Sequence, residues 1–474
     1  MDMTNTASEY QRLRASLAAA GQEHVFAYWE SLGDAERGLL LEDLRRINLS
    51  ELPLLAMIAS GRGAEDRADQ ELEPPPITPR SIVSAKTISH GREWLSAGKV
   101  AAFTVAGGQG TRLGFDGPKG ALPISPIRAK PLFQLFAESI LAARRRCQSP
   151  IPWYIMTSPT NDEATRSFFR ERANFGLPSN DVVFFQQGVM PAFSRTGQIL
   201  LDERHRIALS PDGHGGSLLA LASTGMLADM ARRGVEHISY FQVDNPLVAC
   251  LDPVFIGLHD ETGSEMSSKA LPKADDLERV GNLVLSRGRL TVFEYSDLSE
   301  QLARARNPDG TRRFDAANIA VHILSRAFVE RLTSNRAAFG LPWHRAEKKV
   351  PYVDVATGRR IEPTAPNSIK LESFVFDALP LAKKTLVLGT VREEEFSPVK
   401  NASGIDSIET AKRDMGRRAA RWLEKAGWQI PRKADGEPDG WFEISPLLAA
   451  DAGELIERCL PARRLEPGAH FYLE

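Results

Sequence analysis

The pattern of apolar and polar positions changes along the chain near residue 98. Residues 8–62 place apolar side chains at helical spacing, most clearly in 10–20 and 37–49, and this spacing predicts amphipathic helices. Residues 71–79 read ELEPPPITP. Three consecutive prolines remove backbone donors, so a linker is expected there. We therefore expect an N-terminal helical domain with its linker over residues 1–80.

Beyond residue 98, short apolar runs that resemble buried strands alternate with helical patterns. The strand candidates are 99–108, 151–158, 181–188 and 237–245, and the helical patterns include 131–146 and 215–234. Alternation of this kind predicts an α/β fold with a Rossmann-like, mixed but mostly parallel sheet. Three of the runs end in AGGQG, QQG and VDN. Ligands bind outside the carboxyl ends of such strands, so these ends should surround one crevice.

The pattern of apolar and polar residues changes again after residue 266. Residues 267–300 predict hairpins with a turn at Arg287-Gly288, and 318–332 predict a helix-rich stretch. Residues 440–449 and 468–474 resemble strands of a small appended domain. The expected division is a central domain over 81–390, which would hold the site, and a small C-terminal domain over 391–474.

Charge and composition exclude some classes of function. The formal net charge is −2, so nothing draws the whole chain toward nucleic acid or an anionic membrane. The sequence has no apolar run near the roughly 18 residues that cross a membrane, and its polar start lacks a signal-peptide pattern. Its three cysteines are far apart. We expect a cytoplasmic protein, a monomer or weak homo-oligomer, that binds neither nucleic acid nor membrane.

The glycine-rich segment 105–119 carries the clearest chemistry. It holds five glycines together with Arg112 and Lys119. Bare amides in such a loop can cradle phosphate oxygens, and the two cations supply charge. Lys119 follows proline, which excludes a P-loop, and the glycine spacing does not match a dinucleotide fingerprint. The loop therefore predicts a triphosphate site of another kind.

Further motifs follow this loop in a fixed order. The pattern GGxGTRLG…PK is joined by FFQQGVMPAF, LSPDGHGGSL, QVDNPLV, VFEYSDLS, NIAVH, KKVPYVD, SIKLESFVFD, EEFSPVKNA and EISPL. Together they cover roughly residues 99–446 and resemble the UDP-N-acetylglucosamine pyrophosphorylase branch of the sugar-nucleotide pyrophosphorylases, the UDPGP type 1 family. The resemblance implies a GT-A-like nucleotide-diphospho-sugar transferase fold.

The resemblance also implies an activity. UTP and a sugar 1-phosphate would react by in-line attack on the UTP α-phosphate, giving a UDP-sugar and pyrophosphate. The sugar would be N-acetylglucosamine or N-acetylgalactosamine, and Mg²⁺ or Mn²⁺ would be the cofactor. A carboxylate at a strand end facing phosphates is a natural ligand for such an ion, which gives Asp244 that role.

The matched motifs assign roles residue by residue. The implied catalytic residues are Arg112, Lys119 and Lys400. Those implied to bind the nucleotide are Val105, Ala106, Gly107, Gly108, Lys119, Gln187, Gly213, Asp244 and Lys370. Those implied to bind the sugar or its phosphate are His214, Gly281, Glu294, Tyr295, Asn318, Phe374, Phe376 and Lys400.

Departures from the family pattern leave two alternatives open. His214 stands in PDGHGG where the N-acetylglucosamine enzymes usually have PDGNGG and UDP-glucose enzymes a PPGHGD-like block. The block before Gly281 reads Glu-Arg-Val-Gly where the family often has Glu-Pro-Val-Gly, and Ala-Ala replaces Ala-Gly before Asn318. A UDP-glucose or broad-specificity UDP-sugar pyrophosphorylase is one alternative. A non-catalytic nucleotide-sugar binding protein is the other, although it predicts loss of Lys119, Asp244 or Lys400, which are all present.

Overall fold

The computed structural model describes residues 3–62, 71–334 and 339–474, and the chain divides into two compact units. The first, here called the N-terminal unit, takes Met1–Asp69, Gln187–Ala220 and Thr333–Asp377. The second, here called the sheet unit, takes Gln70–Gln186, Leu221–Leu332 and Ala378–Glu474. Each unit is described by itself.

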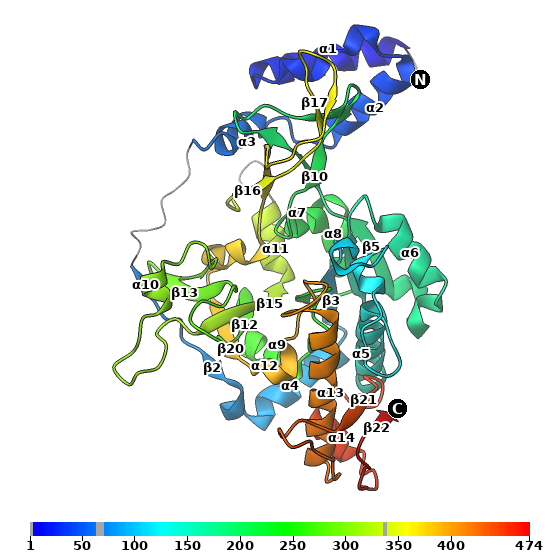
Figure 1. Cartoon of the computed structure of the whole chain (residues 1–474), viewed down its shortest axis with the longest axis vertical. Helices are drawn as coiled ribbons and strands as arrows, with labels where there is room; N and C mark the ends of the chain where they lie inside the picture. The colour runs from blue at the N-terminus through cyan, green and yellow to red at the C-terminus, as the bar shows by residue number, and fades with distance from the viewer. Residues whose placement is uncertain (1–2, 63–70, 335–338) are drawn as a thin grey trace. The chain divides into compact units, whose positions relative to one another are not determined.

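The N-terminal unit combines helices with short strands around one apolar core (Figure 1). Its elements are α1 (Met3–Ala19), α2 (Asp34–Arg45), α3 (Leu52–Ala59), β6 (Val189–Pro191), β7 (Phe193–Ser194), β8 (Leu201–Glu203), β9 (Arg206–Ile207), β10 (Leu209–Pro211), β16 (His344–Lys348), β17 (Tyr352–Val353), β18 (Arg360–Ile361) and β19 (Ser368–Glu372). Helix α7 (Gly216–Ser223) begins in this unit. Tyr10 stacks on Trp29, with ring centroids 4.2 Å apart, and Phe26 meets both edge-on. The apolar faces predicted for residues 8–62 are thus buried in this core.

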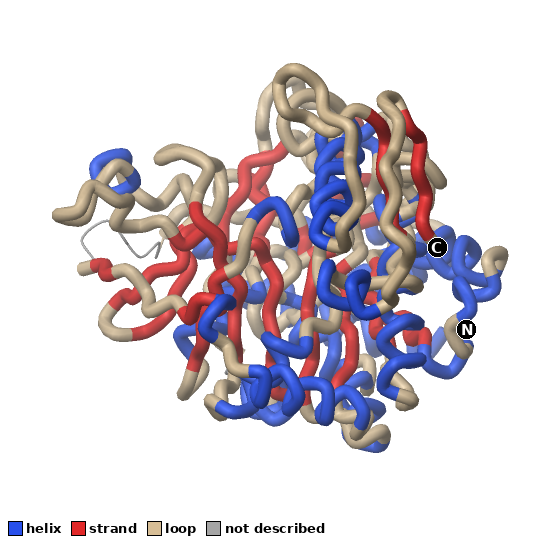
Figure 2. Tube along the Cα trace, turned by 90° about the horizontal axis from the view of Figure 1, so that it is seen from below, coloured by secondary structure: helices blue, strands red, loops and turns tan. Residues whose placement is uncertain are grey.

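The sheet unit is built on one large sheet, whose strands run side by side in Figure 2. The strands of this unit are β1 (Leu72–Glu73), β2 (Thr78–Pro79), β3 (Val100–Val105), β4 (Trp153–Thr157), β5 (Val182–Gln186), β11 (His237–Gln242), β12 (Met266–Pro272), β13 (Asn282–Ser286), β14 (Arg289–Phe293), β15 (Ala316–Ser325), β20 (Thr385–Gly389), β21 (Gly440–Ile444) and β22 (Ala469–Leu473). All of them except β21 and β22 belong to the large sheet. Its helices are α4 (Ala85–Ser96), α5 (Leu132–Cys147), α6 (Asp162–Arg170), α8 (Met226–Arg232), α9 (Pro253–Glu261), α10 (Glu300–Ala303), α11 (Arg326–Thr333), α12 (Arg392–Glu395), α13 (Ile408–Lys425) and α14 (Ala452–Glu457). Strands β21 and β22 pair in parallel with α13 and α14 beside them.

The topology of the large sheet confirms the predicted α/β class. Its strand order is β2-β20-β12-β15-β11-β3-β4-β5. β15 is antiparallel to both of its neighbours β11 and β12, whereas the other pairs along this path are parallel. Strands β3, β4 and β11 are buried along almost their whole length, as expected for a sheet covered on both faces. The carboxyl ends of β3, β5 and β11 therefore lie at one edge, as the sequence predicted.

Two sequence predictions of secondary structure are wrong. The stretch 318–332, expected to be rich in helix, begins as strand β15, and only α11 is helical. Its apolar run is buried between two strands, and a short run of this kind has no periodicity that separates a buried strand from a buried helix. The expected linker 71–79 contains β1 and β2, which pair with β13 and β20. β2 lies at the edge of the sheet, where the missing donor of Pro79 is tolerated.

The predicted hairpin turn is confirmed. Strands β13 and β14 pair antiparallel, and the turn residues Arg287 and Gly288 have φ of +50° and +73°. Two successive positive φ values suit the right-handed twist of a two-residue hairpin.

Among the described helices, none is both long and apolar enough to cross a membrane.

Candidate functional site

The glycine-rich loop leaves the end of β3 and folds back on itself. The N–H of Gly110 donates to the carbonyl of Gly117 at 2.9 Å, and the N–H of Lys119 donates to the carbonyl of Gly108 at 3.1 Å. A β-carbon at position 110 would lie 2.7 Å from the ring of Phe115, so the fold of the loop requires glycine there. Arg112 lies in the short helix η4 (Thr111–Leu113) and is exposed. The arch presents glycine backbone and a cation to solvent, as a phosphate site requires.

The buried side-chain amide of Asn161, which follows the neighbouring strand, holds this loop by hydrogen bonds. Asn161 is 1% exposed, and its Nδ2 donates to the carbonyls of Ala106 and Gly108 at 2.9 and 3.2 Å. It follows β4, the neighbour of β3 in the sheet. Sequence reasoning missed Asn161, although its position just beyond a strand end was a signal. Its two hydrogen bonds hold the start of the loop in place.

The predicted residues Lys119 and Asp244 meet in the sheet unit. The Nζ atom of Lys119 lies 3.4 Å from Oδ2 of Asp244 and donates to the carbonyl of Val399 at 3.2 Å. The N–H of Val399 in turn donates to the carbonyl of Asp244 at 2.8 Å. The glycine-rich loop, the end of β11 and the segment that carries Lys400 are therefore brought together.

Lys400 begins a short loop that closes on Asp406. The N–H groups of Lys400 and Asn401 donate to the carbonyl of Asp406 at 2.7 and 2.9 Å. The Nζ atom of Lys400 lies 3.9 Å from Oδ2 of Asp406. Burial raises the pKa of the Asp406 carboxyl, while the charges of Lys400 and Arg392 oppose this rise. The side chain of Lys400 is 47% exposed, so its ammonium can reach an anionic ligand.

Asn245 ties the same segment to the end of β11. It is 4% exposed, its Nδ2 donates to the carbonyl of Glu395 at 2.7 Å, and its Oδ1 accepts from the N–H of Ser397 at 3.1 Å. The buried ammonium of Lys269 donates to the carboxylate of Glu395 and lies 2.7 Å from Asp252. Lys269 and Arg80 hold the pKa of Asp252 well below its usual range, against the opposing effect of burial. Sequence reasoning missed this support, because buried polar partners depend on tertiary packing.

Three of the residues predicted to bind sugar form one group in the sheet unit. The N–H of Asn318 donates to the carbonyl of Gly281 at 2.8 Å. A β-carbon on Gly281 would lie 3.3 Å from Oε1 of Glu294 and 2.7 Å from the side chain of Val292. Tyr295, next to Glu294, is 49% exposed. The absence of a side chain at position 281 thus leaves space directly beside a carboxylate.

A second group of predicted residues lies in the N-terminal unit. Gly213 has φ of +85°, and a β-carbon there would lie 2.4 Å from the carbonyl of Ser373. The Nδ1 atom of His214 accepts a hydrogen bond from the N–H of Val375 at 3.1 Å, which places the ring hydrogen of the neutral tautomer on Nε2. His214 stacks on Phe374 with centroids 5.1 Å apart and meets Phe376 edge-on at 5.5 Å. These contacts give His214 a fixed orientation.

Two further predicted residues belong to the N-terminal unit. Gln187 directly follows β5 and is 8% exposed. Lys370 lies in β19, and burial lowers the pKa of its ammonium, partly offset by the charge of Glu372. A bound anion would favour the charged form of this partly buried lysine.

The residues around Asp244 fit a hard divalent cation only if substrate helps to bind it. In the described parts of the chain no group of three or more histidine, cysteine, aspartate or glutamate side chains is arranged around a metal position. Mg²⁺ is commonly held by one or two carboxylates together with substrate phosphates and water. Asp244, which follows β11 and contacts Lys119 of the glycine-rich loop, would supply the carboxylate for such an arrangement.

A mixed α/β sheet with a glycine arch after β3 and a carboxylate after β11 is typical of the nucleotide-binding class of α/β proteins. The chain belongs to the UTP–glucose-1-phosphate uridylyltransferase family, whose model matches residues 59–412.

Known relatives narrow the comparison within this family. The human UDP-N-acetylhexosamine pyrophosphorylase-like protein 1 is 37% identical over 96% of both chains. The structure of the Trypanosoma brucei uridine diphosphate N-acetylglucosamine pyrophosphorylase superposes with a TM-score of 0.80 and 26% identity, over 95% of this chain and 94% of that one. The UDP-glucose phosphorylase of the same organism has a TM-score of 0.64 and 15% identity, over 89% and 87%, and therefore shares the fold alone.

Proposed function

We propose that the protein is a uridylyltransferase that forms a UDP-N-acetylhexosamine and pyrophosphate from UTP and the sugar 1-phosphate. The observation that carries this proposal is the contact of Lys119 with both Asp244 and Val399, because it brings together the glycine-rich loop, the carboxylate that we propose as the metal ligand, and the Lys400 segment. The names of the N-acetylhexosamine and N-acetylglucosamine relatives support the choice of sugar.

Asp244 would hold a Mg²⁺ or Mn²⁺ ion together with phosphate oxygens of the substrates. Such an ion supplies neutralisation of phosphate charge during transfer. In the same place Lys119 contacts Asp244, so the ammonium would attract the phosphates directly, whereas the carboxylate would do so only through the bound ion. Gln187 and Gly213 would contact the uracil edge.

The residues of the chain act by positioning and charge. The loop amides, Arg112 and Lys119 hold the β- and γ-phosphates of UTP and the departing pyrophosphate, and Lys370 neutralises nucleotide charge. Lys400 holds the attacking phosphate of the sugar 1-phosphate. Because this phosphate is already anionic near neutral pH, it needs little help from a general base.

The bond changes are those of a single displacement. A phosphate oxygen of the sugar 1-phosphate forms a bond to the α-phosphorus of UTP, in line with the bridging oxygen to the β-phosphorus. The bond to that bridging oxygen breaks, and its electron pair leaves on pyrophosphate. No covalent enzyme intermediate is formed.

The N-acetyl sugar would occupy the space beside Gly281, with Glu294 and Asn318 at its hydroxyls. His214 favours a second candidate, a UDP-glucose or broad-specificity UDP-sugar pyrophosphorylase. Its ring is held by Val375 and Phe374, and it is bulkier than the asparagine usual in N-acetylglucosamine enzymes. The two candidates share the reaction and differ only in the sugar.

We also infer that the enzyme works in the cytoplasm. Its three cysteines are unpaired thiols, which suits a reducing compartment.

The proposal is tested by mixing the full-length protein with UTP, Mg²⁺ and one of four sugar 1-phosphates, and measuring pyrophosphate. The four sugars are glucose, galactose, N-acetylglucosamine and N-acetylgalactosamine. Release should be fastest with an N-acetylated sugar and should stop when a chelator removes the metal. Release with none of the four would refute the catalytic proposal, and a preference for glucose would select the second candidate.

A further inference from the structure

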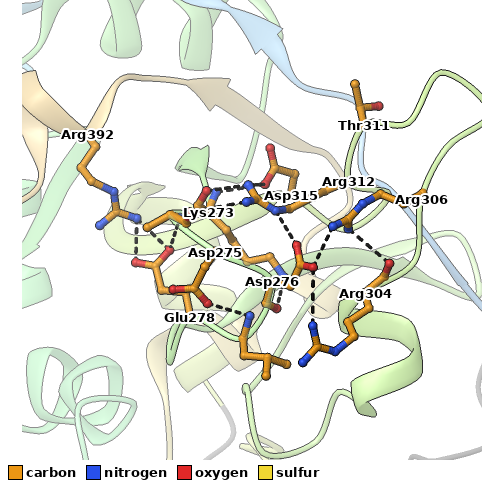
Figure 3. Close-up of polar contacts among 12 residues, drawn as sticks. Lys273, Asp275, Asp276, Glu278, Arg304, Arg306, Thr311, Arg312, Asp315 and Arg392 are labelled. Carbon is orange, nitrogen blue, oxygen red and sulfur yellow. Dashed lines mark hydrogen bonds and ion pairs between the residues drawn. The ribbon is translucent and has the colours of Figure 1, made fainter.

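The segment that leads into Gly281 is held by a network of ion pairs and hydrogen bonds, shown in Figure 3. We call residues 273–281 the strap. It joins β12 to β13 and contains no helix or strand of its own. Since Gly281 lies at its end, the last residues of the strap, from Glu278 onward, decide where the space beside Glu294 is placed. Two sets of contacts hold the strap.

The first set holds the start of the strap. The guanidinium of Arg312 donates to the carbonyl of Lys273 at 2.8 Å and to Oδ1 of Asp276 at 2.7 Å. Arg306 donates to Oδ2 of Asp276 at 2.7 Å, and Lys273, itself 4% exposed, donates to the carbonyl of Asp276 at 3.3 Å. These contacts fix the start of the strap to the loop 304–315 (Figure 3).

The second set holds the end of the strap nearest Gly281. The Nη2 atom of Arg392 donates to both carboxylate oxygens of Glu278, at 2.7 and 2.9 Å. The N–H of Ala274 donates to the same carboxylate at 2.7 Å. The side chains of Arg392 and Glu278 are 30% and 18% exposed, so this pair is better shielded from water than most surface ion pairs.

Arg392 belongs to the segment that ends in Lys400. It is the first residue of α12, whose last residue, Glu395, is bound through its carbonyl to Asn245. The chain then runs past Val399, bound to Asp244, into Lys400. The Arg392–Glu278 pair is therefore a direct link between the strap and the segment that carries the phosphate-binding lysine.

The sequence of this chain increases the importance of that link. Position 279 holds an exposed arginine rather than a proline. Proline fixes φ near −65° and so stiffens a loop by itself. Arg279 leaves that rotation free, and the order of the strap next to Gly281 then depends on Glu278 and its partners.

We propose that Arg392 and Glu278 form a positioning pair that sets the distance between the sugar end and the phosphate end of the bound sugar 1-phosphate. The pair thereby favours N-acetylhexosamine 1-phosphates over hexose 1-phosphates, an inference that rests on the function proposed above. An acetamido group must fit beside Gly281 while its phosphate stays on Lys400. A hexose 1-phosphate lacks that group and tolerates a displaced strap.

The test compares Glu278→Gln with Arg306→Ala as a matched control from the same network. Glu278→Gln removes the charge that Arg392 binds but keeps the size of the side chain. It should raise KM for N-acetylglucosamine 1-phosphate about tenfold and lower the preference over glucose 1-phosphate about tenfold, the effect of losing one charge-assisted hydrogen-bonded pair. KM for UTP should change less than about twofold, because neither Glu278 nor Arg392 is among the residues proposed to bind the nucleotide. Arg306→Ala, which affects only the start of the strap, should leave all three values unchanged.

A charge exchange separates positioning from simple stability. The double variant Glu278→Arg with Arg392→Glu should recover part of the lost preference, whereas each single variant should not. Provided that the wild-type enzyme is active, the inference would be overturned if Glu278→Gln kept the wild-type preference for the N-acetylated sugar. It would also be overturned if Arg306→Ala lost that preference as much as Glu278→Gln does.

Hydrogen exchange of residues 277–281 tests the link independently of turnover. The backbone amides of these residues should exchange faster in Glu278→Gln than in the wild-type protein. In Arg306→Ala they should exchange at the wild-type rate. If the wild-type protein shows no turnover, the proposed function fails on its own. Equal exchange in all three proteins would then overturn the positioning pair as well.

Discussion

At the scale of single residues, the three lysines that are predicted to contact phosphate differ in their surroundings. Lys119 contacts Asp244 and Val399, Lys400 lies near Asp406 and is half exposed, and Lys370 is partly buried. A lysine is a compact point charge that can shift its pKa when buried. The three therefore make different predictions for the same kind of substitution.

Lys400→Ala should reduce turnover far more than UTP affinity. The ammonium would contact the attacking phosphate, whose charge is redistributed in the transition state, and loss of one such donor costs about 10²- to 10³-fold in kcat. Steady-state kinetics and calorimetric UTP binding measure the two effects. Lys425→Ala, at the exposed end of α13, is the control. Unchanged kcat in Lys400→Ala would remove this residue from the mechanism.

Lys370 should make activity sensitive to alkaline pH. Burial lowers the pKa of its ammonium, so the positive charge is present below that lowered pKa and is lost as pH rises through it. For UTP, kcat/KM should therefore begin to fall below the ordinary lysine pKa of about 10.4. Lys370→Arg stays charged and should move the fall to higher pH. Identical alkaline limbs for the two proteins would exclude Lys370 as the source.

At the scale of elements, helix packing supports the strand end that carries Asp244. Helices α4 and α9 cross in backbone contact, because a β-carbon on Gly91 would lie 1.9 Å from the carbonyl of Pro253. A β-carbon on Gly257 would likewise lie 2.1 Å from the carbonyl of Thr87. Helix α9 is capped by Asp252, which belongs to the buried charge network with Lys269 and Arg80. Close packing here fixes the chain that follows β11.

Gly91→Ala should destabilise the protein. The added methyl group must push apart two backbones, and overpacking of this kind costs about 1–3 kcal/mol or more. Differential scanning fluorimetry should show a lower midpoint. Gly38→Ala, in α2, has no atom within 4 Å of the new methyl group and should leave the midpoint unchanged or slightly higher. A midpoint for Gly91→Ala equal to that of the wild-type protein would contradict the close crossing.

At the scale of the whole molecule, the α/β class was predictable because strands and helices alternate with distinct periods. Strand β15 was not predictable, because its apolar run is buried between two neighbouring strands and has no periodicity that separates a strand from a helix. The carboxyl ends of β3 and β11 could be placed at one edge from the motifs, and Lys119 does meet Asp244 there. Asn161, Asn245 and the Arg392–Glu278 pair could not be foreseen, because their partners are distant in sequence. The expected division near residues 80 and 390 stays a prediction, as do the individual roles of the site residues.

The most direct test of the central claim follows the phosphorus atoms themselves. Full-length protein, UTP, Mg²⁺ and N-acetylglucosamine 1-phosphate are combined, and ³¹P NMR is recorded over time, with Asp244→Ala as the comparison. The UTP and sugar 1-phosphate resonances should disappear together as those of a UDP-sugar and pyrophosphate appear, and the reaction should be much slower with Asp244→Ala. Persistence of both substrates in the presence of the wild-type protein, or release of inorganic phosphate without a UDP-sugar, would contradict the proposed uridylyl transfer.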